Sequence, residues 1–217
     1  MMSASHRKVT PWLVLLLLIS VLVCATGAYL LWSQMRLDDA QPKDLQGNIV
    51  ALEDGDLPKG NELKQMNVVS DTGIHLTVPS VGLDVPVGSL SEVNGQITPP
   101  GFTSAYIVRN RGAGNLQEAS KHTLFVVTHS VNHGQAPGNY LINVADGRPT
   151  VAVGEQIHLG TLKYQISGTT TILKSELGGT SSVWEDSPGR LVLITCLQRE
   201  HGKSLKNVVI TAEIDTP

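Results

Sequence analysis

The sequence predicts a mostly β-stranded domain that follows an apolar N-terminal segment. Aromatic residues make up only 4 % of the chain, so the core must be built from valine, isoleucine and leucine. The 21 glycines and 11 prolines indicate many turns. Together with short apolar runs that are rich in β-branched residues, this composition favours an all-β or mostly-β fold.

Charge argues against one broad class of function. The chain of 217 residues has a net charge of -3, and 16 % of its residues are charged. It has no basic surplus and no lysine- or arginine-rich run interleaved with aromatic residues, so nucleic-acid binding has no support. About 145 residues remain after the N-terminal segments, which is enough for one domain with a real core.

The N-terminal segment has the length and charge pattern of a transmembrane anchor. Residues 11–32 carry no charge and are long enough to cross a hydrocarbon core of about 30 Å. Arg7 and Lys8 precede the segment and Asp38 follows it, so the positive-inside rule places residues 1–10 in the cytoplasm and the rest of the chain outside. A cleaved signal peptide is the alternative, although the apolar run is longer than a usual signal sequence.

Residues 33–71 are predicted to form an extracytoplasmic linker between this anchor and a domain at residues 72–217. The stretches 38–44 and 53–60 are polar and have no sustained apolar period. Such a segment cannot bury enough apolar surface to offset the entropy that is lost when it becomes ordered. We therefore expect a spacer that separates the domain from the membrane.

From residue 72 onward, short strand patterns alternate with turns. Residues 74–78 alternate apolar and polar side chains and end at Pro79, whereas residues 123–128 form a continuous apolar run that is typical of a buried strand. Further strands are expected at residues 81–87, 104–108, 155–159, 162–167 with a continuation at 169–173, 191–195 and 208–214. This makes about eight strands with one or two short helices, and closure into a barrel would leave no exposed edge.

Cys196 is the first candidate catalytic residue. It ends the apolar run that begins at Arg190, and the only other cysteine, Cys24, lies in the N-terminal apolar segment. Exported domains usually pair their cysteines or have none, so a solitary thiol outside the cytoplasm is a candidate nucleophile. The alternative is an inert thiol in the core, because free cysteine is often buried.

A second apolar run delivers a histidine in the same manner. His129 directly follows residues 123–128, and if the two strands are parallel neighbours, imidazole and thiol share one rim. A histidine can supply a proton to a leaving amine, and a nearby arginine could hold a developing oxyanion. His133, four residues later in a loop, is the alternative, whereas His122 begins the strand and should lie at the opposite rim.

These residues resemble the sortase family. The similarity is carried by Thr123–Ser130, by the stretch Gly154–Leu159 with Tyr164, and by Leu193-Ile194-Thr195-Cys196, which is similar to the family's strand ending in Thr-Leu-x-Thr-Cys. It spans roughly residues 72–215. The resemblance implies a closed eight-stranded sortase-type β-barrel that needs no metal or organic cofactor.

The resemblance also implies a reaction and its partners. A sortase of this kind cleaves a C-terminal sorting signal of the LPXTG type between Thr and Gly, forming a thioester on its cysteine. An amine of a peptidoglycan precursor, or a lysine of another protein such as a pilin, then resolves the thioester. The resemblance therefore implies a cell-membrane enzyme with its catalytic domain outside the cytoplasm.

The arginine of the family is displaced in this chain. It usually follows the cysteine by about a dozen residues, where this sequence has Leu205, Lys206 and Asn207. Arg199 lies three residues after the thiol and is long enough to reach back to it. We expect Arg199 to take the arginine's role, with Lys206 as the alternative, although lysine cannot offer the same planar fork of donors.

Three further residues are candidates for contact with substrate. Thr128 and Thr195 precede the histidine and the cysteine, and each could orient its neighbour or simply fill a β position. Trp184 lies in the loop 175–189, where sortases build much of the signal-binding groove, but it could equally cap the barrel.

Two other functions remain open from the sequence. A hydrolytic cysteine peptidase would use the same nucleophile, although papain-like enzymes place cysteine before histidine and this chain has His129 before Cys196. A non-catalytic β-domain that binds a cell-wall partner would keep Cys196 as an inert thiol. Reaction of the folded domain with a methanethiosulfonate reagent distinguishes a groove thiol from a buried one.

Overall fold

The computed structural model describes residues 11–39, 41–52 and 55–215, and the chain divides into two compact units, Met1–Gln41 and Pro42–Pro217. The first unit contains helix α1 (Pro11–Asp39). Large apolar side chains such as Trp12, Leu22 and Leu31 are exposed along it. Among the described residues, no helix meets the combined length and hydropathy of a membrane span. The predicted cytoplasmic segment, residues 1–10, lies outside the described part of the chain.

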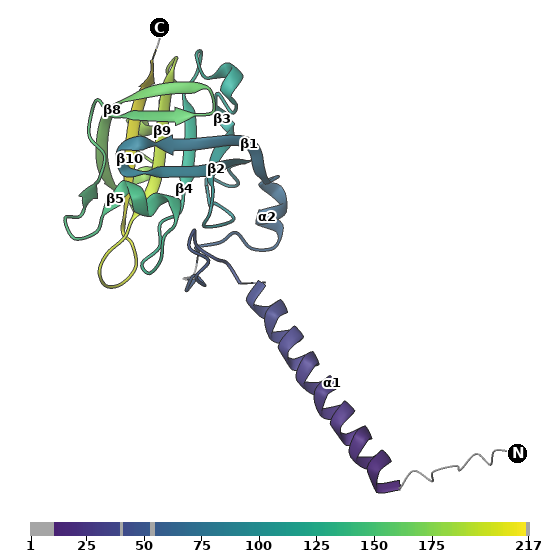
Figure 1. Ribbon diagram of the computed structural model, residues 1–217. Coiled ribbons are helices and arrows are strands. Elements are labelled where there is room, and N and C mark those ends of the chain that lie inside the picture. Colours follow the sequence, from purple (N-terminus) through teal and green to yellow (C-terminus); the bar gives the residue numbers. More distant parts are fainter. Residues whose placement is uncertain (1–10, 40, 53–54, 216–217) are drawn as a thin grey trace, which may run out of the picture. The chain divides into compact units, whose positions relative to one another are not determined.

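The second unit is a closed eight-stranded barrel, as the sequence predicted (Figure 1). Around the barrel the strands follow the order β1-β2-β3-β4-β9-β10-β8-β7, and β7 pairs with β1 to close it. The strands are β1 (Val69–Val78), β2 (Leu83–Leu90), β3 (Ala105–Gly112), β4 (Leu124–Thr128), β7 (Gln156–Leu159), β8 (Leu162–Leu173), β9 (Arg190–Leu197) and β10 (Lys206–Ile214).

The two strands that carry the candidate catalytic residues are parallel neighbours. β4 pairs with β9 in parallel, with Leu124 opposite Leu191 and Val127 opposite Ile194. Both strands are buried along nearly their whole length, as continuous apolar runs of parallel strands usually are. Their carboxyl ends therefore meet at the same end of the barrel, as expected from the sequence.

Two apolar clusters occupy the two faces of these strands. Alternate residues of all eight strands fill the barrel interior, including Leu193 of β9 and Val208 of β10. The other face of β3, β4, β9 and β10 carries a second cluster that includes Ile194 and Val209. Val183 and Trp184 pack on this outer cluster, so β9 and β10 have apolar surface on both sides.

The connections between the barrel strands contain short helices and two short strands. Between β8 and β9 lie α3 (Lys174–Leu177) and α4 (Ser181–Trp184), where a long loop was expected. The remaining short elements are α2 (Asn61–Gln65), η1 (Pro79–Val81), η2 (Leu116–Glu118), η3 (Pro137–Leu141) and the two-residue strands β5 (Ile142–Asn143) and β6 (Arg148–Pro149). β8 is a single strand with a register shift against β10, where the sequence pattern suggested an interruption near Gly168.

The compact unit begins well before the boundary expected at residue 72. Asp44 is only 3 % exposed, and its carboxylate accepts hydrogen bonds from the backbone N–H groups of Gln46, Asn48 and Gln135. The backbone N–H of Leu45 also donates to Gln135 O at 2.8 Å. The predicted spacer is therefore held, over its second part, against the loop that follows β4, because a buried carboxylate supplies the contacts that apolar periodicity lacks.

Candidate functional site

Cys196 lies one residue before the end of β9 and is partly exposed. Strand alternation from Ile194 places its side chain on the outer face of the barrel, away from the interior. Its carbonyl oxygen accepts a hydrogen bond from Ser130 Oγ at 2.6 Å. The thiol thus lies at the edge of the packed sheet, where a reagent or substrate has access to it.

His129 directly follows β4 and lies at the same end of the barrel. The last pair of the β4–β9 ladder is Val127 with Ile194, so two further residues along each chain bring His129 level with Cys196. Adjacent strands are about 4.8 Å apart. The loop after β9, drawn in yellow, and the teal loop after β4 extend from this end in Figure 1. The register thus brings together the two residues that the sequence predicted to converge.

The imidazole of His129 is buried, with 8 % of its surface exposed. Its Nε2 lies 2.8 Å from Pro99 O, and its ring stacks on Phe102 with centroids 4.6 Å apart. Within the described residues, no hydrogen bond joins this ring to Cys196. Hydrogen bonds between catalytic groups are often long or poorly aligned in the absence of substrate.

The surroundings lower the pKa of His129. Burial is the largest cause, since it disfavours the charged imidazolium, and repulsion by Lys174 acts in the same direction. Hydrogen bonds to the backbone of Pro99 and Asp56, and attraction by the Asp56 carboxylate, raise the pKa but do not compensate. At neutral pH the ring is therefore neutral and able to accept a proton.

The lowered pKa of His129 predicts a loss of stability in acid. The unfolded chain protonates histidine at a pKa of about 6.5, whereas the folded protein resists protonation, so the unfolded state binds more protons below that pH. The contribution of the neutral His129 ring to the free energy of unfolding is complete above pH ~6.5 and is lost as the pH falls below that value. Urea midpoints between pH 7.5 and pH 5 should fall more steeply for the wild type than for His129→Gln. Equal slopes in the two proteins would contradict the buried neutral ring.

A polar contact ties the loop after β4 to the end of β9. Ser130 Oγ donates to Cys196 O, and Gln198 Nε2 donates to Ser130 O at 2.7 Å and to Ser130 Oγ at 3.0 Å. We call Ser130 and Gln198 the strand clip. Because the clip joins the residue after His129 to the residues that flank Leu197, it fixes the loop that carries the histidine against the strand that carries the thiol.

Removing either member of the strand clip should destabilise the protein by about 1–3 kcal/mol, because a partly buried bonding partner is left unsatisfied. The two substitutions Ser130→Ala and Gln198→Ala should be non-additive by at least about 0.5 kcal/mol in the double variant, since they remove one shared contact. Urea unfolding measures all three variants. Ser167→Ala on β8 with Gln198→Ala is the matched control pair, and it should be additive.

The two threonines are buried on the face opposite the thiol. Thr195 is 2 % exposed, and its Oγ1 has no hydrogen-bond partner among the residues that the structure describes. Thr128 Oγ1 donates to Ser104 O at 3.4 Å. Gly138, at the start of η3, donates its N–H to His129 O at 2.7 Å, and a Cβ there would overlap Thr195 Oγ1. This close packing supports a role for the threonines in holding the site's backbone rather than in touching substrate.

Arg199 is exposed in the connection between β9 and β10. It lines a hollow of about 550 Å³ together with Gln198, Leu197 and Lys206. This hollow lies at the same end of the barrel as Cys196. Lys206 pairs with Leu197, a residue of the interior cluster, so strand alternation directs it to the face opposite the thiol. Arg199 and Lys206 therefore line the same hollow, and Cys196 is not among its lining residues.

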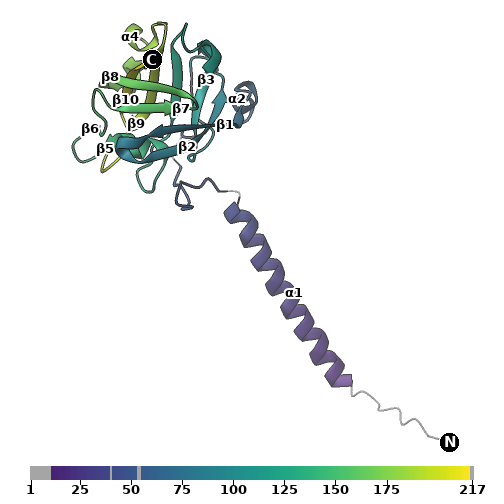
Figure 2. The same ribbon diagram turned by 45° about the horizontal axis from the view of Figure 1, so that its top comes forward.

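Trp184 does not lie beside the thiol. It ends α4, and its indole packs at 5.4 Å on Phe125, four residues before His129 along β4. The indole Nε1 donates to Leu177 O, and the Arg111 guanidinium lies 4.5 Å from the ring centroid. Figure 2 shows α4 at the opposite end of the barrel from β5. Of the two roles left open by the sequence, the structure supports the cap on the barrel.

The alternative histidines are separated from the thiol or open to solvent. His122 precedes β4, so it lies at the end of the barrel opposite Cys196, as expected. Its Nδ1 lies 2.7 Å from Asp186 Oδ2. His133 is exposed in the loop after β4. His129 is therefore the only one of these three that is buried at the carboxyl end of β4.

Sequence reasoning missed several neighbours of the two catalytic candidates. Phe102 and Pro99 come from the connection between β2 and β3, which reads only as a turn. Lys174 begins α3 and lies close enough to His129 to affect its pKa. Asn207 lies directly opposite Cys196 on β10. None of them follows a motif: Asn207 is brought to the site by strand register, and the other three by the connections between strands.

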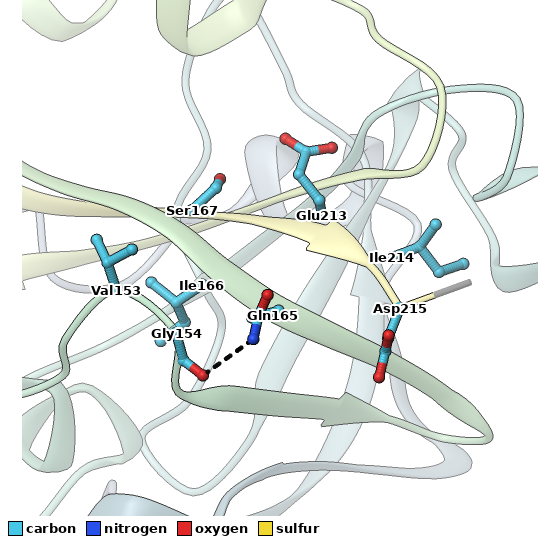
Figure 3. Close-up of a pocket in the computed structure, with 8 residues that line it drawn as sticks. All are labelled: Val153, Gly154, Gln165, Ile166, Ser167, Glu213, Ile214 and Asp215. Atoms are coloured by element: carbon cyan, nitrogen blue, oxygen red, sulfur yellow. Dashed lines mark hydrogen bonds between the residues drawn. The ribbon is translucent and has the colours of Figure 1, made fainter. Parts of the chain in front are cut away.

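A smaller hollow lies at the other end of β10 (Figure 3). It measures about 270 Å³ and is lined by Gln165, Glu213 and Asp215 among others. Gln165 Nε2 donates there to Gly154 O at 3.4 Å. The hollow includes neither Cys196 nor His129, so it is separate from the candidate site.

Solved structures of sortases have a similar arrangement of strands. Sortase A of Listeria monocytogenes is 19 % identical, with a TM-score of 0.46 over 66 % of this chain and 86 % of that chain. A Clostridium perfringens sortase D5 transpeptidase is 11 % identical, with a TM-score of 0.45 over 66 % and 78 %. Streptococcus agalactiae sortase C1 is 14 % identical, with a TM-score of 0.46 over 69 % and 70 %. No family model and no curated protein matches the sequence.

Proposed function

We propose that the protein is a sortase-type cysteine transpeptidase, with Cys196 as nucleophile, His129 as general acid and base, and Arg199 as oxyanion donor. The parallel register of β4 and β9 carries this proposal, because it brings the ends of the two strands level at one rim. The Leu193-to-Cys196 motif and the partial exposure of the thiol support it. Cys196 lies within strand β9, and a strand holds such a group more accurately than a loop does.

The reaction proceeds in two acyl transfers. The thiol proton passes to His129, the sulfur attacks the carbonyl carbon of the scissile bond, and the electron pair of the C=O bond moves to oxygen. When the intermediate collapses, the C–N bond breaks and His129 protonates the leaving amine, which leaves a thioester on Cys196. An incoming amine then attacks the thioester, His129 accepts its proton, and the sulfur departs and recovers a proton.

The substrate and acceptor are finer parts of the proposal. By resemblance of the cysteine motif, the acyl donor is a protein with an LPXTG-like C-terminal signal that is cut between Thr and Gly. The acceptor is an amine of a peptidoglycan precursor or a lysine of another protein such as a pilin. The hollow that Arg199 lines, at the Cys196 end of the barrel, offers space for part of one of these chains.

Peptides that vary the sorting signal, mixed with the protein and a simple amine, test this function. Mass spectrometry should detect a product in which the amine replaces the residues after the cleaved bond. Release of the free acid alone, whatever the amine concentration, would instead support a hydrolytic peptidase. Absence of any cleavage together with an unreactive thiol would support a non-catalytic cell-wall-binding domain.

We propose in addition that residues 11–32 anchor the protein in the cell membrane, with the barrel outside the cytoplasm. The uncharged sequence, the basic residues before it and the exposed apolar side chains of α1 support this proposal. The full chain should then remain in the membrane pellet after extraction at alkaline pH, and added protease should reach the barrel in spheroplasts. Recovery of the full chain in the wash would contradict it.

A further inference from the structure

Asn207 is the cross-strand partner of the candidate nucleophile. β10 pairs with β9 in antiparallel register, and Asn207 lies directly opposite Cys196. Side chains that face each other in such a pair project from the same face, with Cβ atoms about 4.5–5.5 Å apart. On its other side Asn207 lies opposite Ile172 of β8. The amide is therefore set between the thiol and an apolar neighbour.

The Asn207 residue is largely buried, but its amide keeps contact with solvent. Only 8 % of the residue is exposed, yet its amide atoms are not among the fully buried side-chain atoms that lack a hydrogen-bond partner in the described part of the chain. The amide N–H groups are therefore at the surface of the site, where they can donate to a bound group. Val209, the next residue of β10 on the same face, belongs to the apolar outer cluster and offers no polar partner.

The position of the Asn207 amide indicates which group it contacts when Cys196 is acylated. A carbonyl carbon bound to Cys196 Sγ would bring its oxygen within a few ångströms of the sulfur, in the region that the Asn207 side chain faces. An amide N–H is a donor for such an oxygen, and it needs no proton transfer to act. Arg199 lies in an exposed connection, whereas Asn207 is held by hydrogen-bonded neighbours on both sides.

We propose that the Asn207 amide donates a hydrogen bond to the acyl oxygen of the group attached to Cys196. The contact strengthens when the attacking sulfur pushes the carbonyl electron pair onto that oxygen, so it stabilises the tetrahedral intermediate more than the bound substrate. This inference rests on the proposed acyl transfer at Cys196. It assigns Arg199 and Asn207 to the same oxyanion, one as an exposed cation and the other as a strand-borne dipole.

Two reactions of the same thiol test the inference without any sorting peptide. A p-nitrophenyl ester acylates Cys196 through an oxyanion, whereas a methanethiosulfonate reagent forms a disulfide with no oxyanion. In Asn207→Leu, acylation should slow by about 100-fold, as when one donor of an oxyanion hole is removed, while disulfide formation changes by less than about 3-fold. Thr211→Val, on the same face of β10 but remote from the thiol, is the matched control and should leave both rates unchanged. Cys196→Ala defines the background.

The outcomes separate this inference from the proposed function. If Asn207→Leu slows both reactions equally, or slows neither, the proposed role of Asn207 is wrong. It is also wrong if the wild-type thiol forms the disulfide but is not acylated by the ester. If Asn207→Leu does not fold, as judged by circular dichroism, Asn207→Ala is measured in the same way, because it adds no volume. Failure of the wild type to join any sorting peptide to an amine contradicts the transpeptidase, while the ester assay still decides the role of Asn207.

Discussion

Replacing Cys196 by alanine is expected to abolish transpeptidation and to leave the fold nearly as stable as before. Without the sulfur no thioester can form, so the rate should fall by at least about 10⁴-fold, as in other enzymes that lose their nucleophile. The residue is partly exposed and belongs to neither apolar cluster of the barrel. Removing its sulfur should therefore change the free energy of unfolding by less than about 1 kcal/mol.

Leu193, three residues earlier on β9, provides the matched control for Cys196. It is fully buried in the barrel interior, so Leu193→Ala should cost about 2–5 kcal/mol. Peptide turnover by mass spectrometry and urea unfolding compare the two variants. If Cys196→Ala destabilises the protein as much as Leu193→Ala does, the thiol is a core residue, and the assignment of a nucleophile loses its basis.

The strands that carry the site could be predicted from the sequence because burial leaves a strong pattern. β4 and β9 are packed on both faces, so they read as unbroken apolar runs, each ending in a reactive residue. A shared rim required these strands to be parallel neighbours, and the observed register from Leu124 with Leu191 to Val127 with Ile194 meets that condition. The approximate number of strands followed from short alternating segments between turns, whereas the closure of the barrel was implied by the resemblance to sortases.

Contacts made by polar residues could not be predicted in the same way. Asp44 holds the segment before β1 through bonds to backbone N–H groups, and Gln135 shows no corresponding signal in the sequence. Trp184 is part of a short helix that packs on the outer cluster, where only a polar loop was evident. Asn207 faces Cys196 because of the register of β10 with β9, and register depends on all the contacts of the sheet.

Arg199→Ala is expected to lower the transpeptidation rate by about 100- to 1000-fold, the loss seen when an oxyanion donor is removed. Arg199 is exposed, so the free energy of unfolding should change by no more than about 0.5 kcal/mol. Arg199→Lys keeps the charge but loses the planar fork, and it should restore only part of the rate. Steady-state kinetics should place the loss in kcat rather than in KM, because the contact forms in the transition state.

Lys206 and Arg148 provide the comparisons that make the Arg199 result decisive. Lys206 lines the same hollow but faces away from the thiol, so Lys206→Ala should change kcat by less than about 3-fold if the oxyanion donor is on the other face. Arg148 is exposed and paired with Asp146, and Arg148→Ala reports the effect of losing one positive charge elsewhere on the surface. A large loss of kcat in Lys206→Ala with none in Arg199→Ala would transfer the role to the lysine. It would also mean that the connection between β9 and β10 rearranges when substrate binds, because Lys206 reaches the thiol only if its strand pairing with Leu197 opens.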